Sequence, residues 1–82
     1  MKGTPMDEPL MGVIALMPYS FAPKGWAECN GQILNVGQNE ALFALIGTKF
    51  GGEGNGFALP KLSAPPGMKY CIAIEGWFPT QA

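Results

Sequence analysis

Glycine and proline interrupt this chain so often that only short elements of secondary structure can form. The 82 residues include 12 glycines and 8 prolines, and proline neither continues a helix nor donates a hydrogen bond within a sheet. The longest apolar stretch, Leu10–Met17, is interrupted by Gly12 and followed by Pro18. It is far shorter than the roughly 20 apolar residues that a membrane-spanning helix needs. The sequence therefore predicts short elements and no membrane insertion.

Three segments have the residue patterns of secondary structure. Leu10–Met17 is predicted to be a strand that is apolar on both faces, so that both faces need to be covered. Gln38–Ile46 carries apolar residues at helical spacing and is predicted to be a helix that ends at Gly47. Met68–Ile74 alternates in polarity and is predicted to be a second strand. Residues 47–67 contain six glycines and three prolines, and are predicted to be a long loop.

The stretch between the first strand and the helix is rich in turn residues. Pro23 and Gly25 are predicted to turn the chain, and Trp26 to pack into the core. Asn30-Gly31 lies between two short extended pieces, which is the pattern of a hairpin with a type I′ turn. The fold class that follows is α+β, a small domain of a few short strands with one short helix and a long glycine-rich loop. Residues 1–9 are predicted to be a flexible N-terminal arm, and residues 10–82 the domain.

The composition predicts that the chain associates with copies of itself. Hydrophobic residues make up 48% of the chain and charged residues 13%, whereas a domain of this size buries only about 60% of its unfolded surface. Some apolar surface should therefore be covered by a partner. The residues expected at that interface lie in the first strand: Met11, Val13, Ile14, Leu16 and Met17. The chain has no arginine and its five lysines are scattered, which argues against nucleic-acid binding.

The sequence offers no set of residues for catalysis or for a cofactor. It has no histidine, its carboxylates are dispersed, and two cysteines cannot complete a zinc site. The glycine cluster at 51–56 lacks the Lys-Ser/Thr pair of a phosphate-binding loop. Cys29 and Cys71 could form a disulfide, but two buried thiols are the simpler interpretation, and the neighbouring Glu28 would raise the pKa of Cys29. We expect no enzymatic activity, no metal and no cofactor. A redox protein that uses Cys29 and Cys71 is the third class of function to consider.

An alternative function is a small carbohydrate-binding module that uses exposed aromatic residues. Trp77 and Phe78 lie beside Pro79 near the end of the chain, and are the best candidates for an exposed pair on which a sugar ring could stack. The alternative is that Trp77 and Phe78 pack on the core of the domain or on a partner subunit and bind no sugar.

Three blocks of sequence resemble the phage tail collar domain family. They are Phe21-Ala22-Pro23-x-Gly25-Trp26-Ala27-x-Cys29-Asn30-Gly31-Gln32, Asn39-x-Ala41-Leu42-Phe43-x-Leu45-Ile46-Gly47-Thr48-x-Phe50-Gly51-Gly52-x-Gly54 and Phe57-x-Leu59-Pro60. The segment from Gly12 to Pro18 also fits, and the chain resembles a minimal version of this domain. The matched positions are of residue types that turns and cores require: Pro23, Gly25, Trp26, Asn30, Gly31, Leu42, Phe43, Gly47, Gly51, Gly52, Leu59 and Pro60.

The resemblance implies a structural protein of a phage tail fibre or tail-like assembly. It implies a homotrimer, contact with other tail or fibre proteins, and a link to host attachment, in which a cell-surface glycan could be the receptor. The expected location is a virion tail or tail-like particle, of a phage or a prophage, produced in the host cytoplasm.

Overall fold

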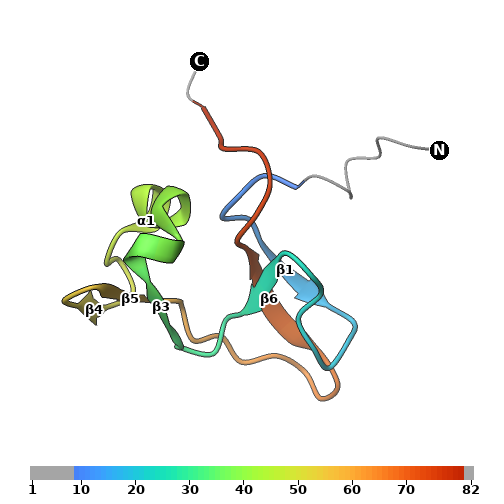
Figure 1. Ribbon diagram of the computed structural model, residues 1–82. Helices are drawn as coiled ribbons and strands as arrows, with labels where there is room; N and C mark the ends of the chain where they lie inside the picture. The colour runs from blue at the N-terminus through green and yellow to red at the C-terminus, as the bar shows by residue number, and fades with distance from the viewer. Residues whose placement is uncertain (1–8, 81–82) are drawn as a thin grey trace.

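The computed structural model describes residues 9–80 as two small sheets and one short α-helix (Figure 1). The α+β prediction is confirmed in its coarse form, although the fold is mostly β. The predicted arm, residues 1–9, lies outside the described residues except for Pro9. The elements in chain order are β1 (Ile14–Met17), β2 (Trp26–Glu28), β3 (Ile33–Asn35), a 3-10 helix (Val36–Gln38), α1 (Glu40–Ile46), β4 (Gly52–Glu53), β5 (Gly56–Ala58) and β6 (Lys69–Ala73).

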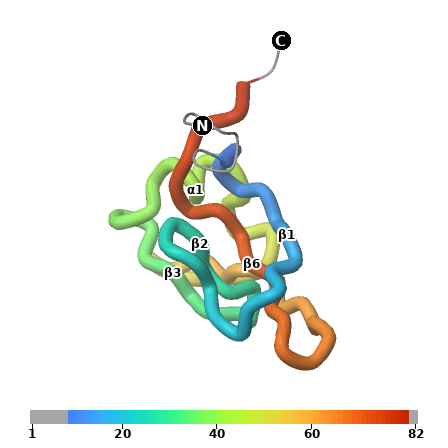
Figure 2. Tube along the Cα trace, turned by 90° about the vertical axis from the view of Figure 1, so that its right-hand side faces the viewer, coloured from blue at the N-terminus to red at the C-terminus, as the bar shows by residue number. Residues whose placement is uncertain are grey.

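The first sheet contains one strand from near each end of the described chain, together with β2. Its strand order is β1-β6-β2, and both pairings are antiparallel. The predicted strand at 68–74 is present as β6, and it lies between β1 and β2 (Figure 2). Ala15 lies opposite Cys71, and Ala27 lies opposite Ile72. β6 therefore gives the first strand a hydrogen-bonded partner about 55 positions further along the chain.

β1 is shorter than the predicted strand Leu10–Met17, because the chain bulges at Gly12. Gly12 N–H donates to the Ala73 carbonyl (2.8 Å), and Ala73 N–H donates to the Val13 carbonyl (2.9 Å). Gly12 and Val13 thus lie opposite the single residue Ala73, as in a β-bulge. Gly12 has a φ of 87°, which favours glycine. Before the bulge, Leu10 forms an isolated parallel bridge with Trp77.

Two strands of the second sheet, β4 and β5, lie within the segment that was expected to be an irregular loop. The strand order of this sheet is β3-β5-β4, again antiparallel. β4 and β5 form a tight hairpin whose turn includes Gly54, at a φ of 62°. The prediction of one long loop over residues 47–67 was wrong here, because glycine spacing indicates turns but does not show that flanking residues pair. Phe57 and Leu59, in and after β5, are fully buried.

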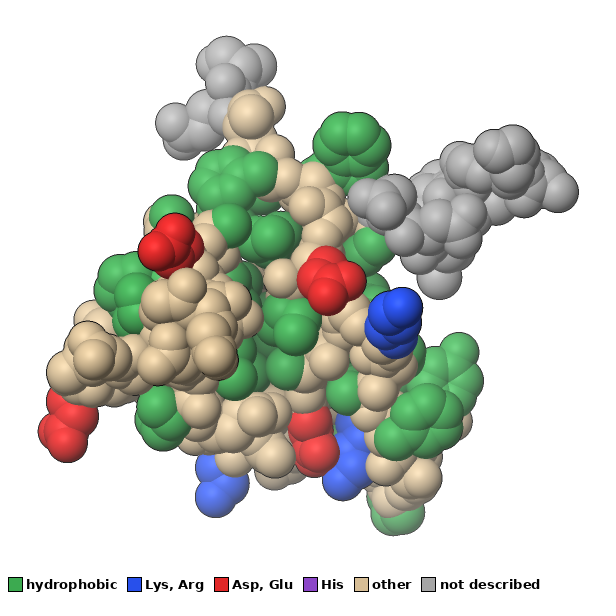
Figure 3. Space-filling model, in the orientation of Figure 1, with side chains coloured by type: hydrophobic (Ala, Val, Ile, Leu, Met, Phe, Trp, Pro, Cys, Tyr) green, Lys and Arg blue, Asp and Glu red, His purple; other side chains and the backbone are tan. Residues whose placement is uncertain are grey.

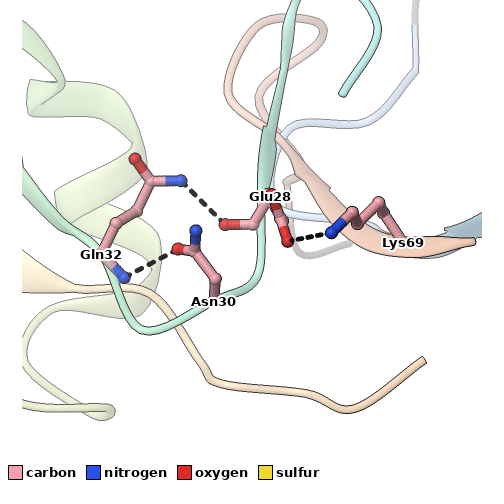
Figure 4. Close-up of polar contacts among 4 residues, drawn as sticks. All are labelled: Glu28, Asn30, Gln32 and Lys69. Carbon is pink, nitrogen blue, oxygen red and sulfur yellow. Dashed lines mark hydrogen bonds and ion pairs between the residues drawn. The ribbon is translucent and has the colours of Figure 1, made fainter. Parts of the chain in front are cut away.

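Asn30-Gly31 connects the two sheets instead of closing a hairpin. β2 before it pairs with β6, and β3 after it pairs with β5. A type I′ turn needs positive φ at both central residues, but within residues 9–80 only glycines have positive φ. Asn30 instead forms an antiparallel bridge with Lys61, and its side-chain oxygen accepts from Gln32 N–H (3.1 Å), as Figure 4 shows.

The helix begins later than predicted. The 3-10 turn comes first, where the Asn35 side chain accepts from Gln38 N–H (3.1 Å), and α1 then begins at Glu40. Gly47 ends it, as the sequence predicted, and donates its N–H to Phe43. The apolar side of this short helix contributes Leu42, which is fully buried.

One hydrophobic cluster holds the helix and both sheets together. Phe43 packs against it with its ring 5.3 Å from that of Phe57. Trp26 is only half-buried and lies outside this cluster, so the expectation that it packs into the core was wrong. The fully buried members are Cys29, Leu42, Phe57, Leu59 and Ile72.

Two phenylalanines provide a matched test of this core. Phe57→Ala should lower the free energy of unfolding by about 3–5 kcal/mol, because it removes a ring from the centre of the cluster. Phe21→Ala should cost less than about 1 kcal/mol, since Phe21 is 62% exposed and Phe57 is 0% exposed. Urea unfolding followed by circular dichroism measures both values. Equal losses for the two variants would contradict the assignment of the core.

Candidate interaction surfaces

β1 presents apolar side chains on both faces of the first sheet. Cross-strand partners share a face, so Ile14 lies with Ile72 on the core side and Ala15 lies with Cys71 on the outer side. Ile72 is fully buried, yet Ile14 remains 40% exposed. Of the five residues expected at an interface, Val13, Ile14 and Leu16 are exposed, and Met11 and Met17 are half-buried. Met11 packs against the core, which gives it an internal role.

An apolar groove of about 370 Å³ runs along the outer side of β1. Val13, Ala15, Leu16 and Met17 line it, together with Tyr19 and Trp26. Trp26 therefore lines a surface groove, and its side chain is half-buried there. Among residues 9–80, no charged side chain lines the groove.

An exposed aromatic pair, Tyr19 and Phe21, stands next to this groove and was not predicted from the sequence. The rings of Tyr19 and Phe21 stack with centroids 5.4 Å apart, and both side chains are exposed. Their spacing of two residues between Pro18 and Pro23 was the available signal, since i and i+2 share a side in extended chain.

A second groove lies between α1 and the C-terminal segment. It has a volume of about 570 Å³ and is lined by Ala44, Leu45, Phe78, Pro79 and Thr80. Trp77 is 64% exposed and does not line the groove, so the two predicted glycan contacts point to different surroundings. Figure 3 shows apolar side chains in several patches over this view of the molecule, with charged groups scattered between them.

The backbone of Trp77 fastens the two ends of the described chain to each other. Trp77 N–H donates to the Pro9 carbonyl (2.9 Å), and Met11 N–H donates to the Trp77 carbonyl (2.8 Å). Gly76 has no room for a side chain there, because a Cβ would overlap the Pro9 carbonyl.

The remaining residues singled out from the sequence lie in turns and around the core. Pro23 accepts a hydrogen bond from Trp26 N–H (3.0 Å). Gly51 and Gly52 precede and begin β4, and a Cβ at Gly52 would overlap the backbone of β5. Pro60 is buried after Leu59. Gly25, Gly31, Gly47, Gly51 and Gly52 all have positive φ.

The two cysteines are free, buried thiols that lie on opposite sides of the first sheet. Cys29 belongs to the core cluster, while Cys71 shares the outer side with Ala15. Burial, together with the nearby Cys71 and Glu28, raises the pKa of Cys29 to about 11. The pKa of Cys71 is also raised, again chiefly by burial. Both thiols therefore stay protonated near neutral pH, which makes them poor nucleophiles.

Charged side chains form one ion pair in the part of the chain that the structure describes. Lys69 Nζ lies 3.1 Å from Glu28 Oε2 on the outer side of the first sheet, and both side chains are about one-third exposed. Residues 9–80 contain no cluster of three His, Cys, Asp or Glu side chains that could hold a metal ion. Within the same range, α1 is too short to cross a membrane.

A model of the Phage Tail Collar Domain family matches residues 12–65, more than half of the 82-residue chain. The chain belongs to the phage tail collar domain family. No curated protein and no solved structure matches it. Membership indicates a structural role in a phage tail fibre and a place in the virion tail.

The collar match covers β1 to β5 but ends before β6. β6 nevertheless carries Ile72 into the core and separates β1 from β2 in the first sheet. The collar domain of this chain therefore needs residues after the matched segment to complete its first sheet.

The buried thiols predict how stability depends on pH. A thiol whose pKa is raised by folding keeps its proton where the unfolded chain loses it, so the free energy of unfolding should fall as pH rises from about 9 towards 11. The double variant Cys29→Ala/Cys71→Ala should show a flatter dependence over this range. Urea midpoints at a series of pH values measure both curves, and parallel curves would refute the assignment.

Proposed function

We propose that this collar domain is a non-enzymatic structural component of a phage tail fibre or tail-like assembly, and that it self-associates, as a trimer. The observation that carries the proposal is the apolar surface of β1. Ile14 and Leu16 are exposed on a strand that has no charged residue, and Val13, just before this strand, is exposed as well. Contiguous apolar surface of this kind marks interaction sites in soluble proteins.

The small core supports the same proposal. The buried hydrophobic set contains several small side chains, such as Ala58, Cys71 and Ala73, whereas Leu16, Phe21 and Ile33 remain exposed. A domain of this size gains stability when copies cover such side chains, because burial of apolar area is the main favourable term in association.

Family membership supports the remaining parts of the proposal. A collar domain in a tail fibre would contact other tail or fibre proteins, and the assembly would act in host attachment. Its place would be the virion tail, or a tail-like particle encoded by a prophage, after synthesis in the host cytoplasm.

Self-association predicts a specific loss in one variant. Sedimentation equilibrium at micromolar concentration should give the mass of three copies for the unaltered chain. Leu16→Asp should reduce this to the mass of one copy, because it places a charge where an apolar contact is expected. Phe50→Asp, at a similarly exposed position outside β1, should keep the trimer. A folded monomer of the unaltered chain would rule out the proposal.

The groove beside Phe78 favours a second candidate, a glycan-binding module. The groove combines an exposed aromatic ring with the hydroxyl-bearing Thr80, and sugars bind by stacking on rings and by hydrogen bonds to polar groups. Its apolar neighbours Leu45 and Pro79 leave few polar partners, which is why we rank it second.

Substitution of the two aromatic residues separates the candidates. If the module hypothesis holds, Phe78→Ala should weaken binding to a panel of immobilised bacterial-surface oligosaccharides at least about tenfold, about 1.4 kcal/mol, and Trp77→Ala, outside the groove, should weaken it less. Phe50→Ala serves as the control and should bind unchanged. Absence of binding by the unaltered chain, or equal binding by all variants, would dismiss this function.

A further inference from the structure

β1 is an edge strand of the first sheet. Along its free edge, some backbone N–H and C=O groups have no hydrogen-bond partner in the described chain. Ala73 N–H donates to Val13 (2.9 Å), and Ala15 lies opposite Cys71. Hydrogen-bonded pairs alternate along an antiparallel ladder, so Ala15 and Met17 bond to β6. Ile14 and Leu16 consequently direct their N–H and C=O groups away from the sheet. Within residues 9–80 these groups have no hydrogen-bond donor or acceptor opposite them.

The opposite edge of the same sheet is partly protected. On β2, Trp26 N–H donates to the Pro23 carbonyl (3.0 Å), and the Glu28 carbonyl accepts from Gln32 Nε2 (2.9 Å), as Figure 4 shows for the second contact. Natural sheets protect their edges by such capping, by charges or by prolines. β1 has none of these devices within Ile14–Met17.

The second sheet has one protected and one open edge as well. β4 is two residues long and carries the charged Glu53. On β3, the Gln32 carbonyl accepts from Leu59 N–H (2.9 Å), and Val36 N–H donates to Asn55 (2.7 Å). The alternation therefore pairs Leu34 with β5 and turns the backbone of Ile33 outward.

Ile33 makes this open edge apolar. Its side chain is 60% exposed, and β3 contains no charged residue. The neighbouring Asn35 also faces outward, and its carbonyl already accepts from Asn39 Nδ2 (3.0 Å). Its N–H remains free to donate, because no partner for it is recorded in the described chain.

We propose that β1 of one copy pairs antiparallel with β3 of a second copy. In this register Leu16 exchanges both backbone hydrogen bonds with Ile33 of the second copy, and Asn35 of that copy donates to the Ile14 carbonyl. The outward groups are two residues apart on both strands, so their spacings match. The inference rests on the self-association put forward above and names the strands that carry it.

The two open edges are unlike, which determines the symmetry of the contact. A contact between unlike surfaces is heterologous, and it forms a ring when its rotation closes. In a ring of three copies every β1 edge and every β3 edge is used once. Pairing of β1 with β1 would be twofold instead, and would leave Ile33 exposed on each copy.

Two proline variants test the pairing. Leu16→Pro and Ile33→Pro each remove an outward N–H, while the bonds to β6 and β5 persist, since proline is tolerated on edges with its nitrogen facing out. Each variant alone should have the mass of one copy in sedimentation equilibrium. An equal mixture should form a species of two copies, because one intact β1 meets one intact β3 and both remaining edges are blocked.

Several results would overturn the inference. If both variants keep the oligomer of the unaltered chain, the edges are not the interface, although self-association itself stands. If Ile33→Pro alone forms a dimer, β1 pairs with β1. A mixture that stays monomeric at the highest attainable concentration excludes the complementary contact. A monomeric unaltered chain would contradict the proposed function too.

Near-ultraviolet circular dichroism checks that each variant is folded. If a proline variant is unfolded, Leu16→Lys or Ile33→Lys replaces it, because a charged side chain also blocks pairing at an edge.

Discussion

The packing of five buried side chains is the interaction on which the rest of this structure depends. Leu42 comes from the helix, Ile72 and Cys29 from the first sheet, and Phe57 and Leu59 from the second. Each sheet has only three strands of two to five residues, and so small a sheet needs its apolar face packed against other elements to be stable. The two sheets and α1 therefore hold their positions through one shared cluster, and the surfaces around it follow from that arrangement.

So small a cluster cannot cover all the apolar residues that the chain carries. β1 has Ile72 beneath it and is still exposed at Ile14 and Leu16, because no segment of residues 9–80 covers these two side chains. A collar domain that works inside a fibre can keep such a strand, since the assembly supplies the missing cover. Pairing between copies would then explain the edges of both sheets. β2 is partly capped because no other copy binds there, whereas β1 and β3 stay open because each pairs with a strand of another copy.

The sequence predicted the elements with strong local signals and missed those set by distant pairing. The alternation in Met68–Ile74 and the helical spacing before Gly47 are local patterns, and both elements are present with shifted ends. Asn30-Gly31 has the composition of a hairpin turn, yet its flanking strands pair with β6 and β5, which lie far along the chain. Trp26 was expected in the core because of its size, but the core was formed by Phe57 from a glycine-rich segment with no readable period. The exposed Ile33 could not be foreseen, because exposure on an edge depends on which strand is last in the sheet.

Amide hydrogen exchange at single residues of β1 tests most directly whether another copy covers this strand. The N–H groups of Ala15 and Met17 are held by β6 and should exchange slowly at every protein concentration. Those of Ile14 and Leu16 should exchange slowly in concentrated protein and rapidly after dilution below the association range. Rapid exchange at Ile14 and Leu16 that does not change with concentration would contradict the account, because β1 would then be open to water even where copies are abundant.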